Sequence, residues 1–108
     1  RDRDWLQFDP SLCYGPSEFI AIVKMADEMG WARRRHGPHG GQQLGLALAA
    51  GLQLGGTETY PLVFQPFGGF GDDVVIEDGM VRVPNAPGLG VETKSELYNT
   101  VLKPLAQG

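Results

Sequence analysis

Extended apolar segments alternate with helical segments over the first 60 residues, and this alternation constrains the fold more than any other feature. Residues 5–8, 31–36 and 57–60 are candidate strands, separated by two stretches with helical patterns. Strands separated by helices are typical of a parallel sheet on which the helices pack. We therefore expect an α/β fold in which the three strands are neighbours.

The two helical stretches have different surfaces. The first begins at Gly15-Pro16 and ends at Gly30, because proline suits the first turn of a helix and glycine suits the position after its end. Its apolar residues recur at the spacing of one helix face: Phe19, Ile22, Val23, Ala26 and Met29. The second stretch, 42–52, is rich in Ala and Leu and nearly free of charge, which predicts burial on more than one side.

The last third of the chain has a different pattern. Residues 74–77 and 80–83 flank Asp78-Gly79, which predicts a β-hairpin with a two-residue turn. A turn-rich stretch then leads into a closing helix, for which Thr93 and Glu96 have the spacing of a capping box. Its expected apolar stripe consists of Leu97, Val101 and Leu102. We expect residues 1–63 and residues 64–108 to be separate structural units.

Composition excludes several classes of protein. The chain has 108 residues, a formal net charge of −4 and a hydrophobic fraction of 42 %, which suit a small packed domain and not a disordered tail. The mild acidity argues against a nucleic-acid partner. No apolar run reaches the roughly 18–20 residues of a membrane span. A lone Cys13 excludes an internal disulfide and fits a reducing compartment, so we expect a soluble, cytoplasmic protein.

His39 is the sharpest candidate for chemistry. It lies in Pro38-His39-Gly40-Gly41, where the backbone is constrained on one side and open to a ligand on the other. An imidazole there can act as a general acid or base near neutral pH, although a solvated loop histidine remains the alternative. Asp9 and Glu58 follow or end the other two candidate strands. If the strands are neighbours and parallel, the two carboxylates converge on His39.

Other charged and glycine-rich stretches predict no site. The tract 33–35 consists of three arginines and is interpreted as a solvated approach to the second strand. The glycines of 68–71 lack the Lys and Ser/Thr of a phosphate-binding loop. Asp72-Asp73 lacks the spaced acids of a calcium loop and is expected at the surface. Cys13 is expected to be a packing thiol.

Six stretches, spread over nearly the whole chain, form a specific ordered pattern: 5–9, 38–43, 49–51, 58–61, 64–70 and 84–92. In this order they resemble the C-terminal part of the mandelate racemase-like group of the enolase superfamily, and within it D-tartrate dehydratase and related acid-sugar dehydratases. The resemblance implies a modified, TIM-type (β/α)₈ barrel with an α+β capping domain. It also implies Mg²⁺-assisted removal of the proton α to a carboxylate.

The resemblance assigns roles to three residues. Asp9 would end the sixth barrel strand, His39 the seventh and Glu58 the eighth, and their separations of 30 and 19 residues agree with the group. His39, oriented by Asp9, would be the general acid for the departing hydroxyl. Glu58 would hydrogen-bond the substrate carboxylate. Residues 1–63 would then supply strands six to eight, and residues 64–108 would contribute to the capping domain.

The remaining parts of such a site are expected upstream of this segment. The group's lysine base belongs to the second strand and its three metal-binding carboxylates to the third, fourth and fifth, so no Mg²⁺ ligand is expected within these 108 residues. Gln42 stands where many relatives carry histidine. The implied partners are an acid-sugar substrate, the missing N-terminal part of the enzyme and a further copy in a homo-oligomer.

We therefore interpret the chain as the C-terminal segment of an acid-sugar dehydratase that converts a 2,3-dihydroxy acid to a 2-keto acid. A racemase or epimerase of the same superfamily is the alternative within the fold. A truncated, non-catalytic piece is an alternative of another class, and a stand-alone binding module is a more distant one. In every case the 108 residues alone are expected to be inactive.

Overall fold

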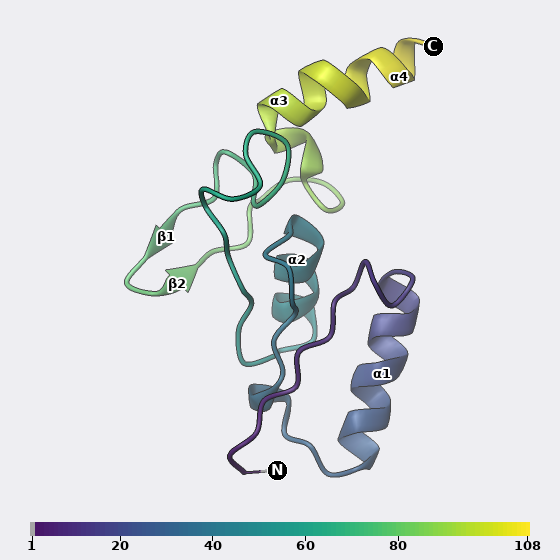
Figure 1. Cartoon of the computed structure of the whole chain (residues 1–108), viewed down its shortest axis with the longest axis vertical. Coiled ribbons are helices and arrows are strands. Elements are labelled where there is room, and N and C mark those ends of the chain that lie inside the picture. Colours follow the sequence, from purple (N-terminus) through teal and green to yellow (C-terminus); the bar gives the residue numbers. More distant parts are fainter. Residues whose placement is uncertain (1) are drawn as a thin grey trace.

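The computed structural model describes residues 2–108, and Figure 1 shows the course of the chain. Its helices and strands follow one another in this order: α1 (Pro16–Glu28), the 3₁₀ turn η1 (Arg33–Arg35), α2 (Gln43–Gly51), β1 (Ile76–Glu77), β2 (Met80–Val81), the 3₁₀ turn η2 (Val91–Thr93), α3 (Ser95–Leu97), the π-helical turn η3 (Tyr98–Leu102) and α4 (Lys103–Gln107).

Helix α1 confirms the first predicted helix. It begins at Pro16, directly after Gly15, whose φ of 108° is open to glycine but strained for other residues. Gly30 follows its end with a φ of 81°, as expected of a glycine that terminates a helix. Three residues of the expected apolar face are buried: Phe19, Val23 and Ala26.

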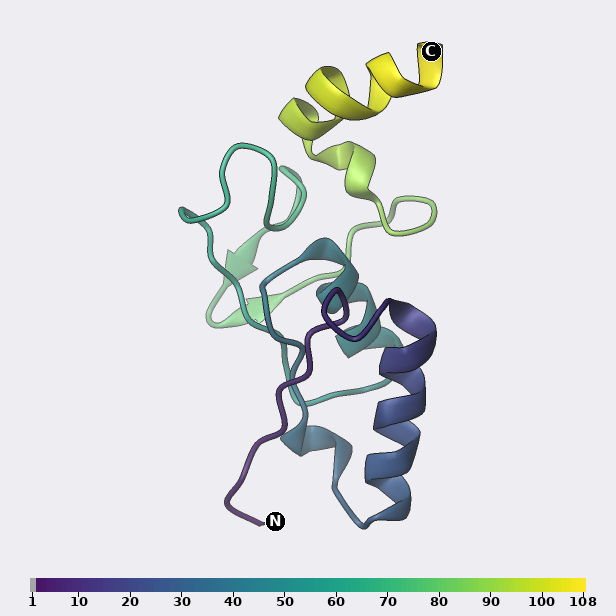
Figure 2. The same ribbon diagram turned by 45° about the vertical axis from the view of Figure 1, so that its right-hand side comes forward.

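Helix α2 lies beside α1, and the two views in Figures 1 and 2 agree on this arrangement. Phe19 and Val23 of α1 form a buried cluster with Leu48 of α2, and six partly buried residues pack against it: Phe8, Cys13, Ile20, Leu44, Leu52 and Leu54. Cys13 is therefore a packing thiol, as predicted. Helix α2 is buried on more than one side, as its uncharged sequence predicts, at Gln43, Gly45, Leu46, Leu48 and Ala49.

Parallel pairing joins the extended segments around residues 5–9, 35–39 and 57–58. Leu6 and His36 form a parallel bridge, and the amide of His39 donates to the carbonyl of Phe8 at 2.9 Å. On the other side, the Glu58 amide donates to the carbonyl of Pro38 at 3.3 Å. The segment 35–39 therefore lies between the other two, and helices pack on it, which is an α/β arrangement.

The three predicted regular strands are wrong in detail. Among the described residues, the parallel pairing at 5–8 and 31–36 is limited to one bridge, and 57–60 forms no strand. Arg33–Arg35 forms a 3₁₀ turn instead, because the Arg33 guanidinium turns back to Asp27 at 2.8 Å and donates to the carbonyl of Leu52 at 2.9 Å. The described residues form no closed barrel, so membership of a barrel stays a prediction.

Side chains alternate between two faces of these segments, as extended backbone requires. Phe8 packs on the helical core, and His36 lies edge-on to it with ring centroids 6.3 Å apart. Gln7 and Asp9 point the other way, where they contact Glu58 and His39. The polar candidates thus share the face opposite the helices.

The hairpin in the last third is confirmed, with shorter strands than expected. Ile76 pairs with Val81 and Glu77 with Met80, in antiparallel register. The two turn residues, Asp78 and Gly79, both have positive φ (50° and 72°), as the type I′ turn requires.

The closing helix differs from the prediction. The predicted capping box is wrong, because the Thr93 hydroxyl donates to the carbonyl of Gly90 and Lys94 occupies the N-cap of α3. Asp72 caps this helix from a distance, since its carboxylate accepts hydrogen bonds from the amide and the hydroxyl of Ser95. The expected apolar stripe is not buried: no residue of α3, η3 or α4 is buried. These elements project from the rest of the molecule in both views (Figures 1 and 2).

Within residues 2–108, no helix is both long enough and apolar enough to cross a membrane. The division of the chain at residue 63 stays a prediction.

Candidate active site at the ends of the extended segments

His39 and Asp9 form a direct side-chain pair. The Nδ1 atom of His39 lies 3.0 Å from Oδ2 of Asp9. Each residue follows one of the two segments that pair in parallel, so the pairing of Leu6 with His36 brings both to the same edge. The His39 side chain is 49 % exposed and the Asp9 side chain only 11 %. One end of the imidazole is thus held by protein while the ring remains open to a substrate.

The Asp9 carboxylate is held on its other oxygen. Its Oδ1 atom accepts hydrogen bonds from the amides of Ser11 (2.7 Å) and Leu12 (3.2 Å) and from the side chain of Gln42 (3.3 Å). The two amide bonds form the local turn typical of Asp before a bend. Three donors on Oδ1 leave Oδ2 facing His39.

Glu58 is the third candidate, and it lies on the far side of the imidazole. Its Oε2 atom is 4.0 Å from Nε2 of His39 and accepts the Gly40 amide at 2.9 Å. Its Oε1 atom accepts a hydrogen bond from the side-chain amide of Gln7 at 2.6 Å. The structure therefore brings His39, Asp9 and Glu58 together, as neighbouring parallel segments predict, while their catalytic roles stay predictions.

The two glycines after His39 are needed for this geometry. Gly40 and Gly41 have φ values of 101° and 61°, which other residues rarely adopt. A Cβ on Gly40 would come within 2.7 Å of the Gln42 amide nitrogen and 3.1 Å of Asp9 Oδ2. A Cβ on Gly41 would come within 2.9 Å of the Tyr60 ring. The glycines allow the loop to lie directly against the carboxylates.

The His39–Asp9 pair shifts both groups toward their charged forms. The hydrogen bond that His39 donates to Asp9 raises the pKa of His39 above its usual 6.5, with partial burial opposing and the negative charges of Glu58 and Asp9 adding to the rise. For Asp9, burial acts to raise the pKa, but the hydrogen bonds from His39, Ser11, Leu12 and Gln42 together lower it. An imidazole held in this way is biased toward the acid form.

Glu58 is also biased toward its charged form. The hydrogen bond from the Gly40 amide is the largest cause that lowers its pKa, and burial opposes it. The interaction of the Tyr60 phenol with Glu58 lowers the pKa of Glu58 and raises that of Tyr60. An ionised Glu58 cannot donate to a carboxylate, so a role on the substrate requires that it share or gain a proton as the substrate binds.

Three polar contacts of the site, made by Gln7, Gln42 and Tyr60, were not predicted. Gln7 and Tyr60 stand two residues from Asp9 and Glu58, and side chains two apart on extended backbone share a face. That signal was available in the sequence. Gln42 stands just before a helix, where no two-residue periodicity points to Asp9, and only the tertiary structure shows the contact.

The described residues do not fit a bound metal ion. No group of three or more His, Cys, Asp or Glu side chains in residues 2–108 is arranged to hold one. The oxygens of Asp9 and Glu58 face His39, amides and Gln7, and not a shared vacant position. Two carboxylates on opposite sides of one imidazole do not form the octahedral set of oxygen ligands that Mg²⁺ requires.

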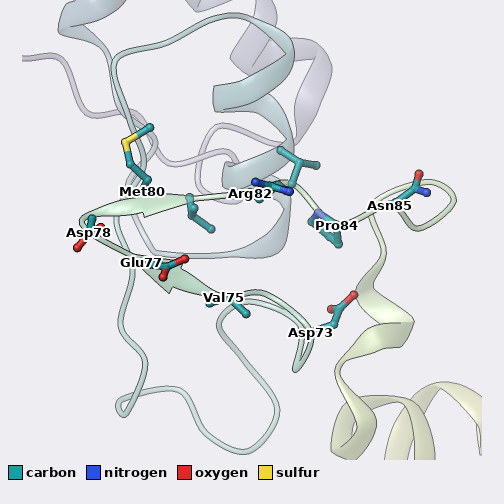
Figure 3. Close-up of a pocket in the computed structure, with 10 residues that line it drawn as sticks. Asp73, Val75, Glu77, Asp78, Met80, Arg82, Pro84 and Asn85 are labelled. Carbon is teal, nitrogen blue, oxygen red and sulfur yellow. The ribbon is translucent and has the colours of Figure 1, made fainter.

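A hollow of the structure lies elsewhere, along the hairpin (Figure 3). It measures about 850 Å³ and is lined by residues between Asp73 and Asn85, among them Glu77 and Arg82. None of His39, Asp9 and Glu58 lines it. Its walls are the two strands and the turns that flank them, so it is an open groove of the hairpin and not the candidate site.

These features define an α/β domain with a histidine–carboxylate centre at the ends of parallel-paired segments. Residues 2–97 match the family described as enolase C-terminal domain-like, and the chain belongs to this family. Members of the enolase superfamily generally use Mg²⁺ and use Lys or His bases at an ene-diolate intermediate. The membership supports an enzyme of the lyase or racemase type in the complete protein.

Proposed function

We propose that this chain is the C-terminal part of an acid-sugar dehydratase that converts a 2,3-dihydroxy acid to a 2-keto acid. The observation that carries the proposal is the His39–Asp9 hydrogen bond of 3.0 Å beside Glu58. The resemblance of the sequence to D-tartrate dehydratase and its relatives supports the choice of elimination. Family membership supports the class of chemistry at a carbon next to a carboxylate.

His39 is the general acid in this proposal. A base outside these residues removes the proton α to the carboxylate, and the bond from the β-carbon to its hydroxyl oxygen breaks. His39 donates its proton to that oxygen, which leaves as water, and the resulting enol becomes a 2-keto acid. Asp9 favours this role because its carboxylate orients the imidazole and stabilises the imidazolium before transfer.

Glu58 acts on the substrate carboxylate. Negative charge moves onto that carboxylate as the ene-diolate forms, and a hydrogen bond that strengthens at this moment lowers the barrier. The proton in this bond lies between Glu58 and the substrate, and Tyr60 and Gly40 stabilise the Glu58 oxygens meanwhile.

The remaining parts of the site lie outside these 108 residues in our proposal. The lysine base and the carboxylates that bind Mg²⁺ are contributed by an N-terminal part of the protein. A homo-oligomer and a cytoplasmic location stay predictions.

The full-length protein tests this function directly. Incubation with a panel of 2,3-dihydroxy acids, including the stereoisomers of tartrate, in the presence of Mg²⁺ should release a 2-keto acid. A carbonyl reagent or a coupled reductase measures the product. The same incubation in D₂O is followed by NMR of the recovered substrate.

The outcomes separate the two activities. Keto-acid release supports the dehydratase. Deuterium at the α-carbon of epimerised substrate, without keto acid, would reject the dehydratase and identify a racemase or epimerase.

A further inference from the structure

Gln42 makes contacts that link two loops of the candidate site. Its Nε2 atom donates to Oδ1 of Asp9 at 3.3 Å, and its Oε1 atom accepts the hydroxyl proton of Ser11 at 2.9 Å. Ser11 belongs to the loop that follows Asp9, whereas Gln42 ends the loop that carries His39. Both polar atoms of one amide are therefore used to connect the carboxylate loop to the imidazole loop.

The Gln42 amide also lies over the backbone of that loop. A Cβ on Gly40 would come within 2.7 Å of the Gln42 nitrogen and 3.4 Å of its amide carbon. The amide therefore fills the space that a side chain at position 40 would occupy. The loop from His39 to Gln42 folds back over Gly40 and is fastened to Asp9 at its far end.

The Gln42 side chain is neutral at every pH, which distinguishes it from the other groups around His39. The groups that face His39 are Asp9 and Glu58, both of which titrate. The Gln42 amide does not titrate, so it donates to Asp9 at every pH. It occupies Oδ1 without competing for Oδ2, the oxygen that His39 contacts.

We propose that Gln42 is a positioning residue: its side-chain amide fastens the Asp9 loop to the His39 loop and thereby holds the imidazole against Asp9 Oδ2. This inference rests on the proposed function for its catalytic consequence. Gln42 acts through Asp9 and does not itself touch the reacting atoms in this scheme.

The test is the titration of His39 in the full-length protein, measured by NMR of the imidazole without substrate. The His39 signal is assigned by its loss in His39→Asn. Gln42→Leu removes both hydrogen bonds at nearly the same volume, so the imidazole separates from Asp9 more often. The titration midpoint should then fall by about half a pH unit toward 6.5.

Gln42→Glu separates the two effects. An ionised glutamate can still accept from Ser11 but cannot donate to Asp9, and it adds negative charge near His39. The lost bond lowers the midpoint and the added charge raises it, so the midpoint should lie above that of Gln42→Leu. Ser11→Ala breaks only the outer bond and should give a smaller fall than Gln42→Leu. Gln107→Leu, the same change at an exposed position of α4, should move nothing.

Gln42→Leu decides the proposal. A midpoint equal to or above that of wild type would overturn it. If Gln42→Leu does not fold, Ser11→Ala decides by the same criterion. A positioning role also requires that Gln42→Leu lower kcat several-fold with little change in KM.

The titration separates this inference from the proposed function. It needs no turnover, so a protein that dehydrates no acid would reject the dehydratase and still give the midpoints. A dehydratase with unchanged midpoints would reject the role of Gln42 alone.

Discussion

The two halves of the chain are held together by different interactions. In residues 2–63 the structure has an apolar core, in which Phe19 and Val23 of α1 meet Leu48 of α2. All of the buried hydrophobic residues described in the structure lie between positions 19 and 49. Large apolar side chains are exposed in both halves, among them Leu12 and Tyr14 in the first and Met80 and Leu105 in the second, but residues 64–108 contribute none to the buried core.

Polar contacts attach the second half to the first. The buried side chain of Gln43 in α2 accepts a hydrogen bond from the Gly71 amide at 3.0 Å. Within the second half, the buried ammonium of Lys94 bonds to Gln65 at 2.9 Å and lies 3.3 Å from Asp72. A few directional contacts of this kind fix the path of a loop but provide less cohesion than a packed core.

This difference explains where the candidate site is found. His39 and Asp9 extend from backbone that the α1–α2 core supports, and a rigid scaffold is what the proposed proton donor requires. The hairpin groove has a volume of about 850 Å³, but no residue of the buried core lines it.

Removal of the imidazole should have the largest effect on activity. In the full-length protein, His39→Asn should reduce dehydration by about two to four orders of magnitude, the usual contribution of a general acid. The thermal unfolding midpoint should change little, since the ring is 49 % exposed. Arg82→Gln, an exposed change in the hairpin groove, should stay within about twofold of wild type. Equal losses in both variants would contradict a site confined to the first half.

Removing one phenylalanine ring from each half tests how much packing in that half contributes to the free energy of unfolding. Phe19→Ala should lower the free energy of unfolding by about 3–5 kcal/mol, because it leaves a cavity in the core. Phe67→Ala should lower it by less than about 1 kcal/mol, because this ring is 45 % exposed. Urea denaturation of the full-length variants measures both. Similar losses would show that the second half has a core of its own.

The two histidines should give the smallest effects, with opposite signs. Both lie in the first half. His36 is 1 % exposed, neither ring nitrogen has a hydrogen-bond partner in the described part of the chain, and burial lowers its pKa below 6.5. Below about pH 6.5 the unfolded chain therefore binds a proton there that the folded chain does not, so stability falls as the pH falls.

His39 has the reverse linkage. Its pKa is raised, chiefly by Asp9, so its stabilisation is present below about pH 6.5 and is lost as the pH rises through the folded-state pKa. Thermal unfolding between pH 5 and 8 should show that His36→Phe gains most over wild type in acid. His39→Asn should lose most in acid. If the unfolding midpoints of both variants ran parallel to that of wild type from pH 5 to 8, the pKa shifts inferred for His36 and His39 would be contradicted.

Local patterns predicted several elements well. Gly15-Pro16 and Gly30 bounded α1 within two residues, because capping preferences act over one turn of helix. Asp78-Gly79 predicted the hairpin, because two positive φ angles favour those residues. The convergence of His39, Asp9 and Glu58 was predicted because the carboxyl ends of neighbouring parallel segments lie at the same edge.

Predictions failed where distant residues compete with local ones. Arg33 leaves the expected strand because Asp27 and the carbonyl of Leu52 bind its guanidinium. Asp72, 23 residues away, caps the helix that Thr93 was expected to cap. Neither partner is visible in a local pattern.

The sequence by itself determined the helices, the hairpin turn and the residue types that carry the candidate chemistry, because spacing and backbone preference are local properties. Only the tertiary structure decided how these groups are used. It placed Gln42 on Asp9, buried the His36 ring without a hydrogen-bond partner among the described residues and turned Gln7 and Tyr60 toward Glu58. Hydrogen bonds and burial depend on which segments meet in space, and that is a property of the whole fold.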